Sequence, residues 1–118
     1  MKLFAPEGYW KLTPEEKEKI VNGAGPKGYG WLVPDTIWGL SITEAANIHD
    51  FCYAVGTTID DKIEADRIFM NNMVRLISAG KWWLKGLRMR RARKYYLAVK
   101  HFGGPAFWSG KNKPGEEK

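Results

Sequence analysis

The chain has 118 residues, of which 44% are hydrophobic and 14% aromatic, so it can form one folded domain and is not generally disordered. Its net charge of +6 is unevenly divided: residues 1–66 carry six basic and eleven acidic side chains, and residues 67–118 carry thirteen basic and two acidic ones. No run approaches the about 20 apolar residues that cross a bilayer, and we expect neither a transmembrane helix nor a signal peptide. The single cysteine, Cys52, excludes an intrachain disulfide and favours a cytoplasmic or virion-associated protein.

The first predicted elements are a short helix and a long loop. Thr13 is a good N-cap, Pro14 suits the first helical position, and Glu16 completes a capping box, so a helix is expected from here to about Gly23. Residues 23–40 then contain five glycines and two prolines among aromatic residues. Because loops of this length in compact domains are commonly functional, we expect an ordered glycine-rich loop.

Two further helices are predicted to form a hairpin. A capping box from Ser41 to Glu44 predicts a helix to about Val55, and a helix that starts at Asp60 or Asp61 should continue to about residue 79. The short link between them predicts that they run antiparallel. Helical spacing predicts an apolar stripe that faces the core on the second of these helices, with Asp66 inside it. The stripe consists of Ile59, Ile63, Asp66, Met70, Met73 and Ile77.

The last predicted element is a strongly basic helix from about Lys81 to Phe102. It mixes arginines with aromatic residues, and we expect Trp83, Leu87, Tyr95 and Val99 to complete the core while the arginines point outward. The predicted fold is therefore mainly α, with an antiparallel two-helix hairpin that follows the glycine-rich loop and precedes a basic C-terminal helix. Residues 1–108 should form a single domain, and residues 109–118 a polar tail.

The candidate chemistry lies in the helix hairpin. His49 and Asp66 each lie about two turns from the connection between the helices, so an antiparallel hairpin brings them level. We expect His49 Nδ1 within about 2.6–3.2 Å of the carboxylate. The pair has two interpretations: a structural contact that satisfies a core histidine, or a catalytic pair in which Asp66 orients a general base. Asp50 and the carbonyl groups of the preceding loop offer the oxygen ligands that Ca²⁺ prefers.

The sequence His49-Asp50-Phe51-Cys52-Tyr53 resembles the His-Asp-x-Cys-Tyr motif of the phospholipase A2 superfamily. The pair Ala65-Asp66 resembles that family's helical aspartate, and Tyr29-Gly30 is similar to the start of its calcium loop. The resemblance covers residues 28–75 and is nearest to the compact, disulfide-free bacterial and fungal forms, with a phage or prophage origin as a further possibility.

The resemblance implies calcium-dependent hydrolysis of a phospholipid acyl ester. His49 would deprotonate the attacking water, Asp66 would orient His49, Tyr53 would donate its hydroxyl to Asp66, and Asp50 would bind Ca²⁺. The sequence departs from the family in the loop, which has no Gly-x-Gly-Gly run. Asp35, after Pro34, is an additional candidate oxygen ligand on chemical grounds.

Three classes of function therefore remain open. The first is a phospholipase A2-type hydrolase, and the second is a non-catalytic domain of the same fold that binds membrane or protein. The third is a nucleic-acid binder driven by the basic second half. A basic helix with tryptophans is typical of an anionic phospholipid surface as partner, although the charge would also suit a solvated face.

Overall fold

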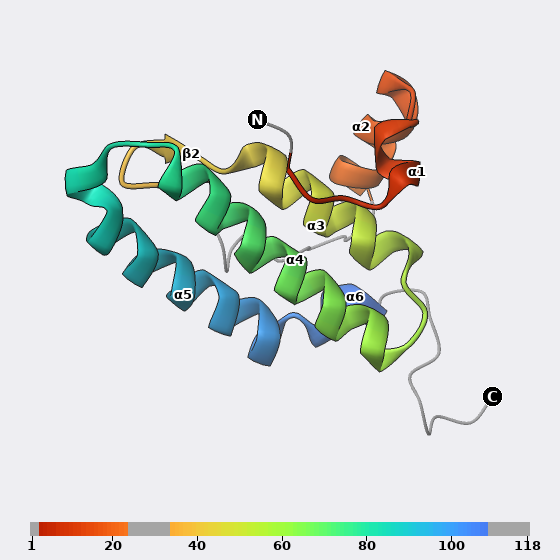
Figure 1. Ribbon diagram of the computed structural model, residues 1–118. Coiled ribbons are helices and arrows are strands. Elements are labelled where there is room, and N and C mark those ends of the chain that lie inside the picture. Colours follow the sequence, from red (N-terminus) through yellow and green to blue (C-terminus); the bar gives the residue numbers. More distant parts are fainter. Residues whose placement is uncertain (1–2, 24–33, 109–118) are drawn as a thin grey trace.

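A computed structural model describes residues 3–23 and 34–108 (Figure 1). It confirms the mainly α class. Residues 24–33 of the expected glycine-rich loop and the expected tail, 109–118, lie outside the described residues. The described elements are α1 (Glu7–Trp10), α2 (Pro14–Gly23), β1 (Thr36–Ile37), β2 (Leu40–Ser41), α3 (Thr43–Val55), α4 (Ile59–Ser78), the 3-10 helix η1 (Trp82–Leu84), α5 (Lys85–Phe102) and α6 (Gly104–Trp108).

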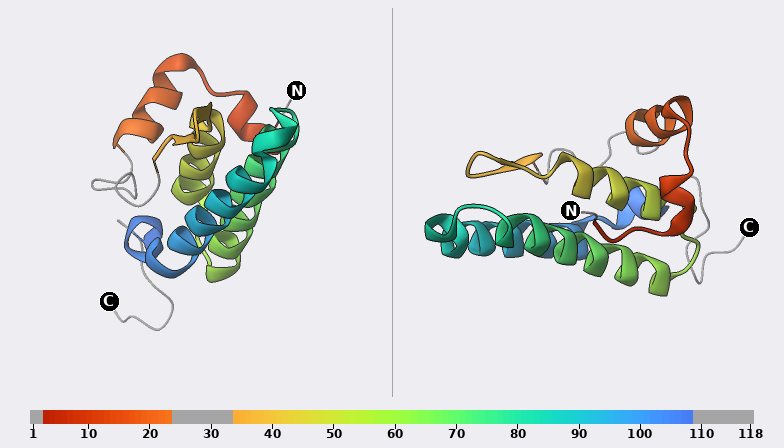
Figure 2. Two further views of the ribbon diagram at one scale, coloured as in Figure 1. Left: turned by 90° about the vertical axis from the view of Figure 1, so that its left-hand side faces the viewer. Right: turned by 45° about the horizontal axis from the view of Figure 1, so that its top comes forward.

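The helix α4 is the central element of the fold. It packs against α3 on one side and against α5 on the other, and the views in Figures 1 and 2 show α4 and α5 lying side by side along the long dimension of the molecule. The short helix α6 contacts both α3 and α5, and α2 packs against α3. The core is formed by apolar side chains that include Ile48 on α3, Phe69 and Met73 on α4, Val99 on α5 and Phe107 on α6. None of the helices in the described part of the chain is long and apolar enough to cross a membrane.

The predicted start of α2 is confirmed, whereas the predicted capping box of α3 is wrong and the helix begins one residue later than expected. The Thr13 hydroxyl accepts a bond from Glu16 N at 3.1 Å, and the Glu16 carboxylate accepts one from Thr13 N at 3.0 Å. Ser41, by contrast, belongs to β2, and Ile42 is the N-cap of α3. The Glu44 carboxylate accepts a hydrogen bond from the Tyr9 hydroxyl instead of closing a capping box. The carboxylate therefore joins α3 to the N-terminal helices.

The helix α4 begins as expected within two residues, but its predicted apolar stripe is only partly correct: Asp66, Met73 and Ile77 are buried as expected. Thr58 is the N-cap and forms a capping box with Asp61. Ile59 and Ile63 are exposed, and Met70 is only half-buried. The buried face includes Lys62, Ala65, Asp66, Phe69, Asn72, Met73 and Ile77. This face also has helical spacing, and it includes a lysine and an aspartate because the two charges neutralise each other inside the fold.

The end of the predicted loop forms a small β-hairpin. Its turn is Trp38-Gly39, with φ values of 47° and 81°, as a two-residue type I′ turn requires. The hairpin is fixed to α5 by two side chains: Tyr95 Oη donates to Thr36 O at 3.0 Å, and Arg88 Nη2 donates to Trp38 O at 2.8 Å.

The helix predicted from about Lys81 to Phe102 is divided into η1 and α5, and its expected core face is only partly correct. Tyr95 and Val99 are buried as expected, but Trp83 and Leu87 are exposed and Arg88 is buried. Arg88 lies inside because the hairpin covers it and supplies a carbonyl acceptor. Trp83 and Leu87, which were expected in the core, thus lie on the surface.

A first prediction concerns Gly103, the C-cap of α5. A Cβ atom at this position would stand 2.5 Å from Val99 O and 2.7 Å from the Tyr53 hydroxyl oxygen. We expect Gly103→Ala to lower the free energy of unfolding by about 1–3 kcal/mol, because the backbone carbonyl cannot move away cheaply. The measurement is chemical denaturation. Gly104→Ala is the matched control, since the added methyl would meet no described atom within 4 Å apart from its chain neighbours and its own helix backbone. An equal loss in both variants would contradict the prediction.

Candidate functional site: a buried histidine–aspartate pair

His49 on α3 and Asp66 on α4 form the hydrogen bond that the sequence predicts. The distance between His49 Nε2 and Asp66 Oδ1 is 2.7 Å, and both side chains are buried. The expected nitrogen was Nδ1, which is wrong. Nε2 lies farther from the backbone than Nδ1, so it is the ring atom that reaches across the space between the two helices. With Nε2–H donating to the carboxylate, Nδ1 carries the lone pair of the neutral ring.

Asp66 receives hydrogen bonds on both carboxylate oxygens. Tyr53 Oη donates to Oδ1 at 2.7 Å, as expected, and Lys62 Nζ donates to Oδ2 at 2.8 Å. Burial acts to raise the pKa of Asp66, but the bonds and charges of His49, Lys62 and Tyr53 outweigh it and hold that pKa below its usual value. The carboxylate is therefore charged at neutral pH, and it can stabilise a positive charge on the imidazole.

Lys62 belongs to this buried network and was not predicted from the sequence. Its ammonium group is buried and also donates to Val99 O at 3.1 Å and to Lys100 O at 3.4 Å. These carbonyls belong to the last turn of α5, where a cation is favoured by the helix dipole. The available signal was the spacing of four residues between Lys62 and Asp66, which places both on one side of α4. Lys62 thus joins α4, α5 and the His49–Asp66 pair.

The imidazole of His49 is enclosed by aromatic rings. The ring centroids of Tyr53 and Phe69 lie 4.2 Å and 4.7 Å from its own centroid. Burial lowers the pKa of His49, although the bond and charge of Asp66 act in the opposite direction. The ring is neutral at pH 7 and can accept a proton. Because the side chain is fully buried, a reactant reaches it only when neighbouring groups move.

The lowered pKa of His49 predicts how stability depends on pH. The unfolded histidine binds a proton below about pH 6.5, whereas the folded one resists protonation, so unfolding takes up a proton in that range. Stability should therefore be full above that value and fall by up to about 1.4 kcal/mol per unit as the pH is lowered below it. Asp66, with its lowered pKa, adds a separate loss only below about pH 4.

Denaturation curves at pH 5, 6 and 7 measure this effect. His49→Gln should flatten the dependence above pH 5. A pH dependence that persists in His49→Gln would assign the effect to another group.

The candidate metal ligands are not gathered into a cluster of acidic side chains. Asp50 is half-buried next to the pair, and Asp35 is exposed just before β1, where its carbonyl accepts Ile42 N at 2.9 Å. In residues 3–23 and 34–108, no three side chains of His, Cys, Asp or Glu are placed to share a metal ion. Of the loop carbonyls that were expected to face a cation, those of residues 24–33 lie outside the described part of the chain.

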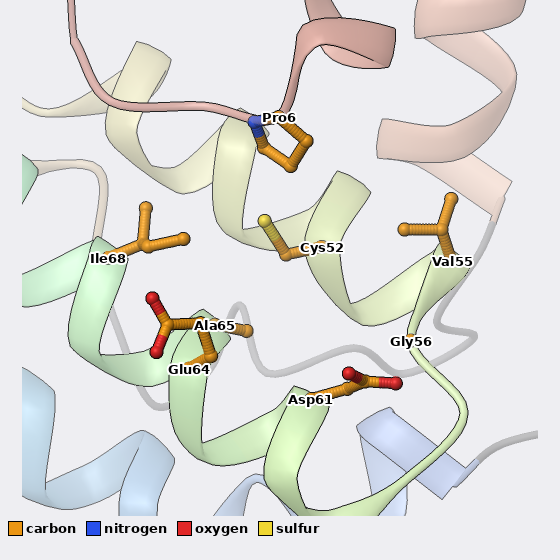
Figure 3. A pocket seen from close by; sticks show the side chains of 8 residues that line it. All are labelled: Pro6, Cys52, Val55, Gly56, Asp61, Glu64, Ala65 and Ile68. Atoms are coloured by element: carbon orange, nitrogen blue, oxygen red, sulfur yellow. The ribbon is translucent and has the colours of Figure 1, made fainter.

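A separate pocket lies between α3 and α4 (Figure 3). It is lined by Pro6, Cys52, Val55, Gly56, Asp61, Glu64, Ala65 and Ile68, so neither His49 nor Asp66 contributes to it. Burial, assisted by the charge of Glu64, raises the pKa of the Cys52 thiol to about 11. The thiol is protonated at neutral pH and is a poor nucleophile. The pocket is thus chemically distinct from the histidine–aspartate pair.

Comparison of the chain with protein-family models, with curated proteins and with solved structures found no match. A function for this chain must therefore be inferred from its own residues and their geometry.

Proposed function

We propose that the protein is a phospholipase A2-type hydrolase that cleaves an acyl ester of a phospholipid. The observation that carries the proposal is the bonding of His49 to Asp66, with Tyr53 on the same carboxylate oxygen, at the positions of the His-Asp-x-Cys-Tyr motif. A neutral histidine beside a charged, fully bonded carboxylate has the protonation states that base catalysis needs.

The proposed reaction uses His49 as a proton carrier. Nδ1 removes a proton from water as the water oxygen attacks the ester carbonyl, and Asp66 stabilises the resulting imidazolium through Nε2. When the bond between the carbonyl carbon and the alkyl oxygen breaks, the same proton passes to the departing alkoxide. The products are a fatty acid and an alcohol, and His49 is again neutral. Tyr53 and Lys62 keep Asp66 in place throughout.

Calcium belongs to the proposal as the partner of Asp50, with Asp35 as a further candidate ligand. Such an ion would supply positive charge to the ester carbonyl oxygen. By the family resemblance, carbonyl groups of the glycine-rich loop before α3 would be its further ligands.

A second candidate function is a non-catalytic domain of the same fold. The complete burial of His49 and the ion pair between Asp66 and Lys62 favour it, because a satisfied histidine inside a core needs no catalytic role. In this case the network would stabilise the helix packing, and the protein would act through its surface.

Fatty acid release from mixed phospholipid vesicles distinguishes the two functions. The hydrolase should release fatty acid at millimolar calcium, and release should stop when a chelator is added. An absence of release above background with several headgroups, from protein whose folding is verified by circular dichroism, would reject the hydrolase and leave the non-catalytic domain.

A further inference from the structure

We propose that one end of the molecule is a docking surface for anionic phospholipid membranes. This surface, the tryptophan end, consists of Trp38 on the hairpin turn and of Trp82 and Trp83 on η1. Their exposed fractions are 51%, 85% and 61%. Leu87, on the first turn of α5, is also exposed. Large apolar side chains gathered on a surface commonly mark a binding site, and tryptophan is favoured at the boundary between lipid and water.

The hairpin and η1 are held at the same end by Arg88. Its Nη2 donates to Trp38 O at 2.8 Å, and its Nη1 lies 3.0 Å from where a Cβ of Gly80 would stand, just before η1. Figures 1 and 2 show β1–β2 and the turn between α4 and α5 at the same end of the molecule. Because Arg88 is buried and bonded to the hairpin, the three indole rings project from packed elements and not from a separate loop.

The backbone of Trp38 also favours a role for this residue outside the core. Its φ of 47° lies in the left-handed region, which a bulky residue rarely adopts, and a glycine or asparagine would suit this turn better. The indole nevertheless occupies the turn and remains exposed, so packing inside the fold does not compensate for the strained backbone.

The charges around the tryptophan end indicate the chemistry of its partner. The Arg91 guanidinium lies 5.4 Å from the centroid of the Trp38 ring, and Lys81 Nζ lies 5.7 Å from that of Trp83. The sequence has no acidic residue between Asp66 and Glu116. Protruding indoles bordered by cations fit an anionic lipid surface, where the rings enter the interface and the cations meet phosphate groups. A second copy of the same basic end would be repelled.

The test is binding to vesicles in the presence of a chelator, which separates docking from calcium-dependent hydrolysis. We compare phosphatidylcholine vesicles with vesicles that contain phosphatidylglycerol, and we titrate salt. Wild-type protein should prefer the anionic vesicles. Trp82→Ser/Trp83→Ser should weaken binding at least about tenfold, and Lys81→Gln/Arg91→Gln should weaken it about fivefold for each charge removed and reduce its salt dependence.

Phe102→Ser is the matched control, because Phe102 is 63% exposed on the last turn of α5 and should leave vesicle binding unchanged. Equal binding by Trp82→Ser/Trp83→Ser and wild type would overturn the proposal. Binding of labelled DNA without vesicle binding would assign the basic surface to nucleic acid. A wild-type dimer that this double substitution converts to monomer would assign the surface to self-association. Vesicle binding without fatty acid release would reject the hydrolase but support the docking surface.

Discussion

Replacing Lys62 with methionine should lower the free energy of unfolding by about 3–5 kcal/mol, which is the usual cost of removing one partner from a buried ion pair. Methionine has a similar length and fills the space, but it leaves Asp66 Oδ2 and the carbonyls of Val99 and Lys100 without the ammonium that bonds them. Chemical denaturation at pH 7 measures the loss. Lys62→Met/Asp66→Asn should cost less than the sum of the two single substitutions, because the uncompensated charge is gone.

The control for this prediction is the same substitution in an exposed pair of the same spacing. Lys11 pairs with Glu7 at 3.4 Å, also four residues apart, and both side chains are more than 70% exposed. Lys11→Met should therefore change stability very little. If Lys62→Met were equally mild, the buried ammonium would contribute nothing to the native state, and the network around Asp66 would need another explanation.

His49→Gln should reduce fatty acid release about 10²- to 10⁴-fold, which is the typical contribution of a general base. Glutamine can still donate an amide proton toward Asp66 from nearly the position of Nε2, but it cannot accept a proton from water. The measurement is the initial rate of release from anionic vesicles at millimolar calcium, on variants whose circular dichroism matches that of the wild type.

Two further substitutions separate the roles within the site. Asp66→Asn should reduce release less than His49→Gln, because the base remains while its orientation and charge support weaken. Asp50→Asn should remove the response to calcium if Asp50 binds the ion. Unchanged release from His49→Gln would show that any hydrolysis arises elsewhere in the chain or from a contaminant.

The histidine–aspartate pair could be predicted from the sequence because that prediction needs few assumptions. Two helices, a short connection and equal distances from that connection are sufficient to bring His49 and Asp66 level, and the structure places them 2.7 Å apart. Tyr53 follows at one further helical turn. Local signals were also sufficient for the start of α2, where both capping bonds involve residues three apart.

Lys62 and Arg88 could not be placed in the same way. A lysine or arginine is assigned to the surface from its type alone, and its burial depends on acceptors distant in the chain: Val99 O for Lys62 and Trp38 O for Arg88. Exposure of Ile59 and Ile63 has the same origin, because the pair of Lys62 and Asp66 occupies the side of α4 that faces its neighbours. Periodicity finds a helical face, but long-range partners decide which face is buried.

The buried Cys52 thiol can report on transient opening of the helix packing. The thiol is the protein's single cysteine, it lies one helical turn from His49 on α3, and its raised pKa keeps it unreactive while the helices are closed. A thiol reagent would therefore label it during transient openings, so the labelling rate follows the free energy of those openings. Comparing the labelling rate with and without vesicles would then show whether membrane binding changes how often α3, the helix that carries His49, opens. No engineered probe is needed.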